Sequence, residues 1–159
     1  MLGGGATEAD GALTLTEGIV PGSLVQALAP ALPSGEGFEI EVLVSLPTEE
    51  PGAYGGVLFG WSDNGTFGYA ALHPPEIWLG SFTDGVADDV VDLYDDGLYN
   101  NGYGPLRLRI RAEPEEGRVR VWLDGVLVLD GDELPVGGRL GLFAKDSPAV
   151  FDDLVIRRP

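Results

Sequence analysis

The stretch from Pro105 to Arg158 alternates apolar and polar residues with a period of two, and this pattern constrains the fold more than any other feature of the chain. In LRLRIRAE, leucine and isoleucine occupy one set of alternate positions and three arginines occupy the other, and RVRVWL continues the alternation. Successive side chains of a strand point to opposite faces, so one face packs on a core and the other meets solvent. The pattern predicts antiparallel β-sheet, and Asp124-Gly125 between two runs predicts a tight two-residue hairpin.

Short apolar runs separated by turn residues extend this architecture over the rest of the chain. The sequence contains 25 Gly and 12 Pro, spread throughout, and no window shows a convincing helical period. Many short strands with regular turn signals are typical of a sandwich or barrel, so we predict an all-β fold of about a dozen strands. The predicted strands are Ala12–Thr16, Ser23–Leu28, Gly37–Leu46, Tyr54–Trp61, Phe67–Leu72, Ile77–Phe82, Val90–Tyr94, Pro105–Ala112, Arg118–Leu123, Val126–Asp130, Gly138–Ala144 and Val150–Arg157.

The length of the chain indicates one domain. A chain of 159 residues buries roughly 70% of its unfolded surface, which gives a core without covalent staples. The sequence has no cysteine, which excludes disulfides, thiolate metal sites and cysteine nucleophiles. Residues 1–11, MLGGGATEADG, are predicted to be a Gly-rich linker or tail without signal-peptide character, and residues 12–158 a single sandwich domain. No stretch approaches the ~20 apolar residues of a membrane span, so membrane insertion is not expected.

The charge of the chain is strongly acidic and unevenly distributed. The net charge is −17, all nine basic residues lie at or after Arg107, and residues 1–106 contain neither Lys nor Arg. Because phosphate contacts need clustered basic residues, nucleic-acid binding is not expected. The scarcity of Asn, Gln, Met and Cys fits a thermophilic source, and a GC-rich genome fits it equally well.

A second hairpin is predicted at Asp63-Asn64-Gly65, between GGVLFGW and FGYAAL. The expected register places Trp61 opposite Phe67 and Phe59 opposite Tyr69. This register gathers the aromatic side chains on one face, which is expected in the core. It leaves a face of Gly and Ala open to close approach by a ligand or another backbone.

Several segments, in this order, carry a family resemblance: DGALTL, GFEIEVLVSL, GGVLFGWSDNGTFGYAAL, LRLRIRAEPEEGRVRVWLDGVLVLDG and GRLGLFAKDSPAVFDDLVIRR. Across nearly its whole length the chain resembles the concanavalin A-like lectin/glucanase superfamily, especially its bacterial laminin-G-like and keto-disaccharide-hydrolase-like modules. The resemblance implies a jelly-roll β-sandwich of two curved antiparallel sheets, often with a concave sugar-binding face, in an extracellular or cell-surface protein. The superfamily includes lectins, glycoside hydrolases and adhesive modules, so the fold does not decide the function.

Catalytic patterns are weak in this sequence. Glycoside hydrolysis needs two carboxylates that flank the scissile bond, and the Glu-x-Asp-x-x-Glu pattern of the glucanase members is absent. The nearest candidate, Glu39-Ile40-Glu41, is better interpreted as a solvent-facing pair. The only histidine, His73, lies in HPPE and is expected to be a solvated turn residue. We therefore predict that the chain is not an enzyme.

The segment from Asp84 to Tyr103 combines six aspartates with three tyrosines. Oxygen-rich loops bind Ca²⁺, and tyrosines offer a ring for stacking together with a polar hydroxyl. The spacing of the aspartates matches no EF-hand or repeat Ca²⁺ motif. A sugar-binding loop and a solvated acidic loop both remain open for this segment.

A structural Ca²⁺ site is a further implication of the resemblance. Related sandwiches often hold Ca²⁺ between the N-terminal strand and an aspartate of the last strand. The matching residues here are Asp152, in VFDDLVI, and Glu17, in LTEG. The alternative is that Asp152 and Asp153 mark a β-bulge.

Five arginines share one face of the predicted pair of strands: Arg107, Arg109, Arg111, Arg118 and Arg120. Such a ladder binds an anionic glycan or another carboxylate-bearing partner, or it pairs internally with acidic neighbours such as Glu39 and Glu41. Unpaired like charges across a sheet are destabilising, so internal pairing is the preferred interpretation.

The function predicted from these features is that of a non-catalytic, lectin-like carbohydrate-binding module, extracellular or at the cell surface, as part of a secreted protein or its mature form. The alternatives are a structural or adhesive module that binds protein or associates with itself, and thirdly a glycoside-processing enzyme. The expected partner is a glycan or another extracellular ligand. The predicted sugar-binding residues are Trp61, Trp78, Tyr94, Tyr99 and Tyr103.

Overall fold

A computed structural model describes residues 4–9, 11–17, 37–47, 52, 54–61, 65–83, 86–94, 104–145 and 147–158. This part of the chain forms strands and turns, and no helix in it is long and apolar enough to cross a membrane. The strands are β1 (Gly4–Ala9), β2 (Ala12–Glu17), β3 (Phe38–Ser45), β4 (Tyr54–Trp61), β5 (Phe67–His73), β6 (Glu76–Thr83), β7 (Val86–Tyr94), β8 (Leu106–Glu113), β9 (Arg118–Leu123), β10 (Val126–Gly131), β11 (Arg139–Lys145) and β12 (Ala149–Arg157).

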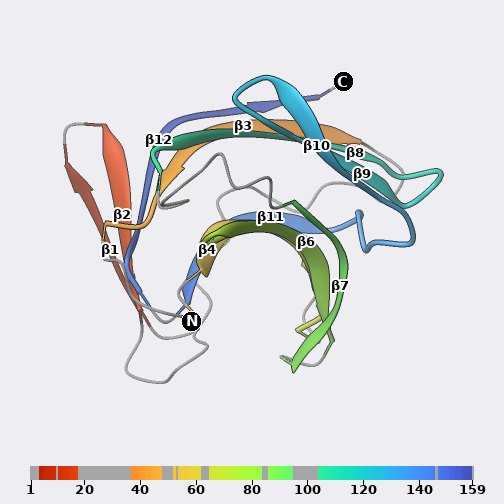
Figure 1. The fold of residues 1–159 in the computed structure, drawn as a ribbon, viewed down its shortest axis with the longest axis horizontal. Coiled ribbons are helices and arrows are strands. Elements are labelled where there is room, and N and C mark those ends of the chain that lie inside the picture. Colours follow the sequence, from red (N-terminus) through yellow and green to blue (C-terminus); the bar gives the residue numbers. More distant parts are fainter. Residues whose placement is uncertain are drawn as a thin grey trace.

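The strands form two antiparallel sheets that confirm the predicted jelly-roll sandwich. A seven-stranded sheet has the order β1-β2-β12-β3-β8-β9-β10, and a five-stranded sheet has the order β11-β4-β5-β6-β7. Both sheets are curved, and the five-stranded sheet nests under the arch of the other (Figure 1). The concave face of the five-stranded sheet is therefore turned away from the seven-stranded sheet.

The main core lies between the two sheets and follows the predicted alternation. On β3 the residues Phe38, Ile40, Val42 and Val44 are buried, whereas the residues between them are partly exposed. The alternate residues of β8 and β9 are buried in the same way. Apolar burial of this kind stabilises by roughly 25 cal/mol per Å², so this layer supplies most of the driving force for folding.

The hairpin at Asp124-Gly125 is confirmed. Leu123 pairs with Val126, and Asp124 and Gly125 have φ angles of +48° and +87°. Two positive φ angles in a two-residue loop match the right-handed twist of the flanking strands.

The N-terminal prediction is wrong for Gly4–Ala9, which form β1 instead of a linker and pair with β2 along its length. Gly11 has a φ of +82° in the turn between the two strands. The first predicted strand is confirmed as β2, whereas the predicted strand Ser23–Leu28 lies outside the described residues. The predicted strand Val90–Tyr94 is confirmed and extends back to Val86, in β7.

The predicted register between β4 and β5 is wrong by one residue. Phe59 pairs with Gly68, and Leu58 pairs with Tyr69. Residues of β4 and β5 that were expected to share a face therefore lie on opposite faces. Both faces of the five-stranded sheet carry aromatic side chains, and no face of Gly and Ala is left open.

The backbone of Gly60 gives part of the physical reason. Its φ is +64°, and β4 shifts register against β11 between the pairs Leu58–Gly141 and Trp61–Arg139. A Cβ atom on Gly60 would lie 2.0 Å from the carbonyl oxygen of Pro135. An extra residue in one strand bends it and changes the face of the residues that follow. Trp61 therefore packs with Leu58 on the concave face and not with Phe59 in the main core.

Candidate functional site

The concave face of the five-stranded sheet carries an aromatic layer that is separate from the main core. Its buried members come from β4, β5, β6 and β11, and Trp61 and Trp78 pack against them half-buried. The buried members are Tyr54, Leu58, Phe67, Tyr69, Ala71, Phe82 and Phe143. A sheet face turned away from the core is ordinarily polar in an antiparallel sandwich. This face therefore differs from the usual pattern.

The rings at the centre of this layer pack edge to face or stacked. Phe143 meets Tyr69 at a centroid distance of 5.9 Å and an interplanar angle of 81°, and Phe67 stacks on Phe82 at 4.8 Å. Such pairs contribute about 0.5–1.5 kcal/mol each beyond the area that they bury. Burial raises the pKa of Tyr69 to about 12. The centre of the face is therefore a closely packed layer of buried aromatic rings.

One end of the face carries a stacked pair of rings. His73, at the end of β5, stacks on Trp78 of β6 with ring centroids 3.7 Å apart and planes within 9°. Tyr54 lies beside both rings, at 6.2 Å from Trp78 and 5.4 Å from His73. The indole N–H of Trp78 donates to the Glu76 carboxylate, and the Lys145 ammonium lies 5.2 Å from the centre of the Tyr54 ring. Hydrogen bonding and stacking both fix the plane of Trp78.

The other end of the same face carries Trp61, with the Arg139 guanidinium 6.0 Å from its ring centre. Tyr54 and Trp61 are the first and last residues of β4. Seven residue steps at about 3.3 Å each separate the two ends by roughly 20 Å. The face therefore presents two half-buried tryptophans with an aromatic layer between them.

Of the predicted sugar-binding residues, the structure places Trp61 and Trp78 on this one face. Tyr94 lies in β7, where its backbone pairs with Ile77, the residue before Trp78. Its side chain is not described, and Tyr99 and Tyr103 lie outside the described residues. Sequence reasoning missed Tyr54, whose place beside Trp78 depends on the sheet order and has no local signal.

The expectation that His73 is a solvated turn residue is wrong. The ring is half-buried against Trp78, and its Nδ1 atom is buried without a hydrogen-bond partner. Burial lowers the pKa of His73, and this effect outweighs the opposite effect of the nearby Glu76 carboxylate. The imidazole is therefore held in its neutral form, which stacks on the indole without a desolvated charge.

The register does not bring the predicted metal ligands together. On β12, Phe151 pairs with Leu13 and Ala149 pairs with Leu15, so Asp152 and Glu17 extend in opposite directions along the paired strands. Five residue steps separate them, or about 17 Å, whereas Ca²⁺ ligands lie within 2.6 Å of the ion. Asp152 and Glu17 do not fit one Ca²⁺ site, and the described residues contain no group of three His, Asp or Glu side chains fit for a metal ion.

A bulge occupies the place of the predicted metal ligand. The pairing of β12 with β3 shifts between Asp152 and Val155, and Asp153 has a φ of +52°. The amide of Asp153 donates to the Asp152 carboxylate at 2.8 Å. The alternative interpretation, that these aspartates mark a bulge, is confirmed.

The acidic pair of β3 is paired with arginines, as preferred from the sequence. Glu41 lies 3.3 Å from Arg107, and Glu39 lies 3.3 Å from Arg157. Both carboxylates lie on the outer face of the seven-stranded sheet, away from the aromatic layer.

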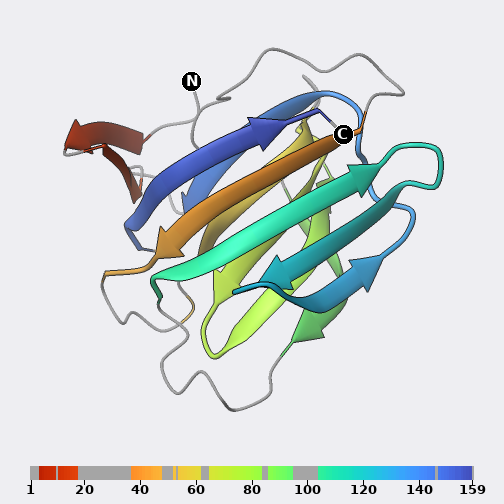
Figure 2. The ribbon, with the colours of Figure 1, turned by 90° about the horizontal axis from the view of Figure 1, so that it is seen from above.

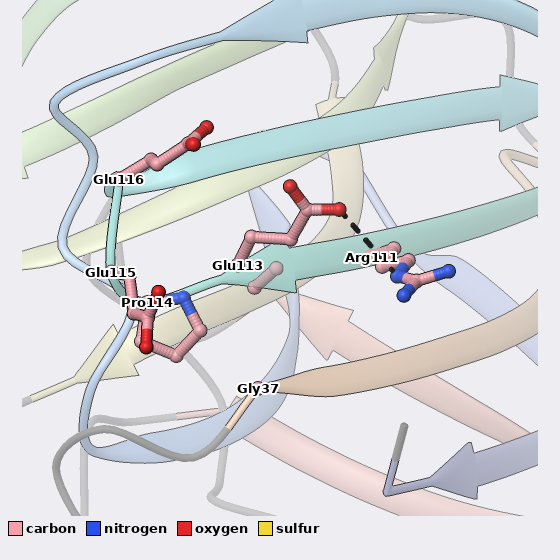
Figure 3. Close-up of a pocket in the computed structure, with 7 residues that line it drawn as sticks. Gly37, Arg111, Glu113, Pro114, Glu115 and Glu116 are labelled. Atoms are coloured by element: carbon pink, nitrogen blue, oxygen red, sulfur yellow. Dashed lines mark ion pairs between the residues drawn. The ribbon is translucent and has the colours of Figure 1, made fainter.

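A pocket of about 320 Å³ lies at the turn between β8 and β9 (Figure 3). Its carboxylates belong to Glu113, Glu115 and Glu116. Glu113 pairs with Arg120 at 2.9 Å and with Arg111 at 3.7 Å. The pocket is an acidic recess at the ends of β8 and β9, and its Glu113 carboxylate is already ion-paired.

Comparison with solved structures identifies the architecture. The chain aligns over 98% of its length with 92% of a carbohydrate-binding module of group 66 from Bacillus subtilis, at a TM-score of 0.60 and 17% identity. It aligns over 83% of its length with 95% of sheep galectin-11, at a TM-score of 0.57 and 13% identity. It also aligns with a prokaryotic β-1,3-1,4-glucanase (lichenase) derived from a mouse hindgut metagenome, at a TM-score of 0.63 and 10% identity. This alignment covers 97% of this chain and 83% of the glucanase.

These likenesses confirm the predicted concanavalin A-like β-sandwich fold. No protein-family model matches the chain, and no curated protein matches it in sequence. At identities of 10–17% the solved structures show the fold alone, and they include binding modules, lectins and glycosidases. The function must therefore come from the residues of this chain.

Proposed function

We propose that this protein is a lectin-like carbohydrate-binding module that binds a glycan at the half-buried tryptophans of the concave face of the five-stranded sheet, above all at Trp78, while the aromatic layer between them stays buried. The observation that carries the proposal is the Trp78–His73 stack beside Tyr54, at the end of an aromatic layer that continues to Trp61. The fold neighbours named as a carbohydrate-binding module and a galectin support the same class of ligand.

The chemistry of this face suits a sugar ring. A sugar ring has apolar C–H faces and a polar edge, so its recognition needs a flat aromatic surface together with polar groups beside it. Trp78 supplies the flat surface, Glu76 supplies a carboxylate at its edge, and Lys145 supplies an ammonium group beside the neighbouring Tyr54. The indole plane is fixed before binding, so little conformational entropy is lost when the ligand stacks.

The arrangement favours binding without catalysis. Both glycosidase mechanisms use two carboxylates on either side of the scissile bond. Glu76 is bonded to the Trp78 indole, and Glu39 and Glu41 lie on the other sheet in ion pairs with arginines. A module of this kind serves an extracellular or cell-surface protein by holding it on a glycan.

The test is a glycan array followed by calorimetry on the best uncharged ligand. We expect Trp78→Ala to weaken binding by about tenfold or more. A nucleic-acid base stacked on an aromatic side chain contributes about 1–3 kcal/mol, and we expect a sugar ring stacked on the indole to contribute a similar amount. Trp122→Ala is the matched control, because it removes a half-buried tryptophan from the opposite sheet. Loss of binding in the control and not in Trp78→Ala, or no binding to any glycan class, would reject the proposal.

A second candidate function, self-association, is favoured by exposed apolar residues at the strands β10 and β12. Val126 and Leu127 are 62% and 49% exposed in β10, an edge strand of the seven-stranded sheet. Leu154, Val155 and Ile156 are 38–39% exposed. An edge strand such as β10 is a template for pairing with another chain, whereas β12 lies inside the sheet and contributes exposed side chains alone. Light scattering coupled to gel filtration tests this candidate, and a monomer at all concentrations would exclude it.

A further inference from the structure

The outer face of the seven-stranded sheet carries the arginine ladder, and Figure 2 looks down on this face. Four of its five arginines are neutralised within the chain. Arg107 pairs with Glu41, Arg118 binds Asp130 through two hydrogen bonds of 2.7–2.8 Å, and Arg120 pairs with Glu113. Arg111 lies 3.7 Å from Glu113 as well. The interpretation preferred from the sequence holds for these four.

Arg109 is the exception. Among the described residues no carboxylate lies within ion-pair distance of it, and its Nε atom is buried without a hydrogen-bond partner. Glu41 is its direct neighbour in the register, but the Glu41 carboxylate reaches Arg107 and Arg157 instead. A guanidinium without a carboxylate is unexpected in a chain with 26 acidic residues. The buried Nε is closed to a ligand, and the Nη groups are the donors that a group from outside the chain could use.

A tryptophan fixes the position of this free cation. The Arg109 guanidinium lies 4.3 Å from the ring centre of Trp122, its neighbour on β9. The next residue across the sheet is Leu127 of β10, which is 49% exposed. Contact with the indole holds the planar guanidinium in one orientation, and its two Nη groups remain as donors to a carboxylate because Nε is buried. Guanidinium, indole and leucine thus form one row across three strands.

We propose that the row Arg109–Trp122–Leu127 is a second binding site, specific for a carboxylate-bearing sugar such as a uronic acid residue. The guanidinium binds the carboxylate, and the partly exposed indole and Leu127 contact the apolar edge of the sugar ring. This site lies on the opposite sheet from the concave face and does not depend on the function proposed there.

The position of the row favours a glycan over an acidic peptide. β8 lies between β3 and β9, and β9 lies between β8 and β10. The backbone groups of β8 and β9 are therefore paired with neighbouring strands, so a peptide in contact with Arg109 and Trp122 has no strand edge to pair with there; the edge of the sheet lies at β10, beyond these two residues. Recognition must come from side chains alone, and a polymer that carries one carboxylate per ring fits a flat face of this kind.

The experiment measures binding of oligogalacturonate to the full chain at low salt by calorimetry. The neutral comparison is the same oligomer with its carboxylates methyl-esterified. We expect saturable binding of the acid form, weakened about tenfold or more by Arg109→Gln and less by Arg109→Lys, which keeps the charge but loses the planar fork. Arg111→Gln is the matched control, on the same strand and face but ion-paired, and it should change the affinity less than about twofold.

Three results would overturn the proposal. The first is no saturable binding of the acid form, and the second is an equal loss of affinity in Arg109→Gln and Arg111→Gln. The third is that poly-L-glutamate binds as tightly as oligogalacturonate and depends on Arg109 to the same extent. Thermal unfolding shows whether each variant is folded. Should Arg109→Gln not fold, the indole N–H resonance of Trp122 in the unmodified protein must shift with the acid form and not with the ester. Trp78→Ala should leave this binding unchanged, which separates the site from the one on the concave face.

Discussion

The replacement Gly60→Ala tests the bulge that turns Trp61 onto the concave face. The φ of Gly60 is +64°, and an added Cβ would lie 2.0 Å from the oxygen and 2.5 Å from the carbonyl carbon of Pro135. A left-handed backbone costs a residue with a Cβ about 1–2 kcal/mol. Relief of a clash with backbone atoms costs about 1–3 kcal/mol more. We expect the free energy of unfolding to fall by about 3 kcal/mol.

Gly125→Ala provides the matched control. Gly125 also has a positive φ, +87°, but no atom lies within 4 Å of the Cβ that alanine would add. Only the backbone strain of about 1–2 kcal/mol therefore applies. Urea unfolding followed by circular dichroism measures both variants. The free energy of unfolding falls by about 1–3 kcal/mol per M of urea, so the Gly60→Ala midpoint should lie about 1 M or more below that of the unmodified protein. Equal midpoints for the two variants would refute the close approach of β4 to Pro135.

Three further predictions concern ionisable groups and metal. Because burial lowers the pKa of His73, its protonation opposes folding, so stability should fall as the pH drops below about 6.5, and His73→Gln should flatten this loss in thermal melts between pH 7 and 5. The hydrogen bond from Arg118 lowers the pKa of Asp130, so its contribution is present above the unfolded pKa of 3.8 and lost at lower pH. The stability difference between the unmodified protein and Asp130→Asn should therefore disappear near pH 2, and a constant difference would contradict the ion pair. Since Asp152 and Glu17 are far apart in register, Asp152→Asn should change the melting temperature by the same amount in calcium and in excess chelator, to within about 1 °C, and a stabilisation by calcium that is lost in Asp152→Asn would restore the metal hypothesis for this pair.

The strands of the C-terminal third could be predicted because their signals are local. Alternation in β8 and β9 and the Asp124-Gly125 turn each depend on neighbouring residues. Internal pairing of the arginines followed from charge alone, since β3 offered two glutamates on the same face. These features can be predicted from the period of the alternation and from the sign of the charges on the neighbouring strand.

The site could be predicted less well because it depends on contacts between distant segments. The face of Trp61 is set by Gly60 against Pro135, which lies 75 positions later in the chain (135 minus 60). The partner of His73 is Trp78, and the turn between them gave no sign of a stack. Arg109 lacks a carboxylate partner because the Glu41 carboxylate lies beside Arg107 and Arg157 instead. Sequence patterns carry strand period and turn chemistry, but they do not carry these choices among neighbours.

The three tryptophans allow one direct measurement of the central claim, because Trp61 and Trp78 lie on the concave face and Trp122 lies on the opposite sheet. Each indole N–H gives one resonance in a nitrogen–proton correlation spectrum, assigned by Trp→Phe variants. On titration with a neutral glycan that the protein binds, we predict that the Trp78 resonance, and with a long ligand that of Trp61, moves while that of Trp122 stays in place. Movement of Trp122 alone, with Trp61 and Trp78 unchanged, would contradict glycan binding on the concave face.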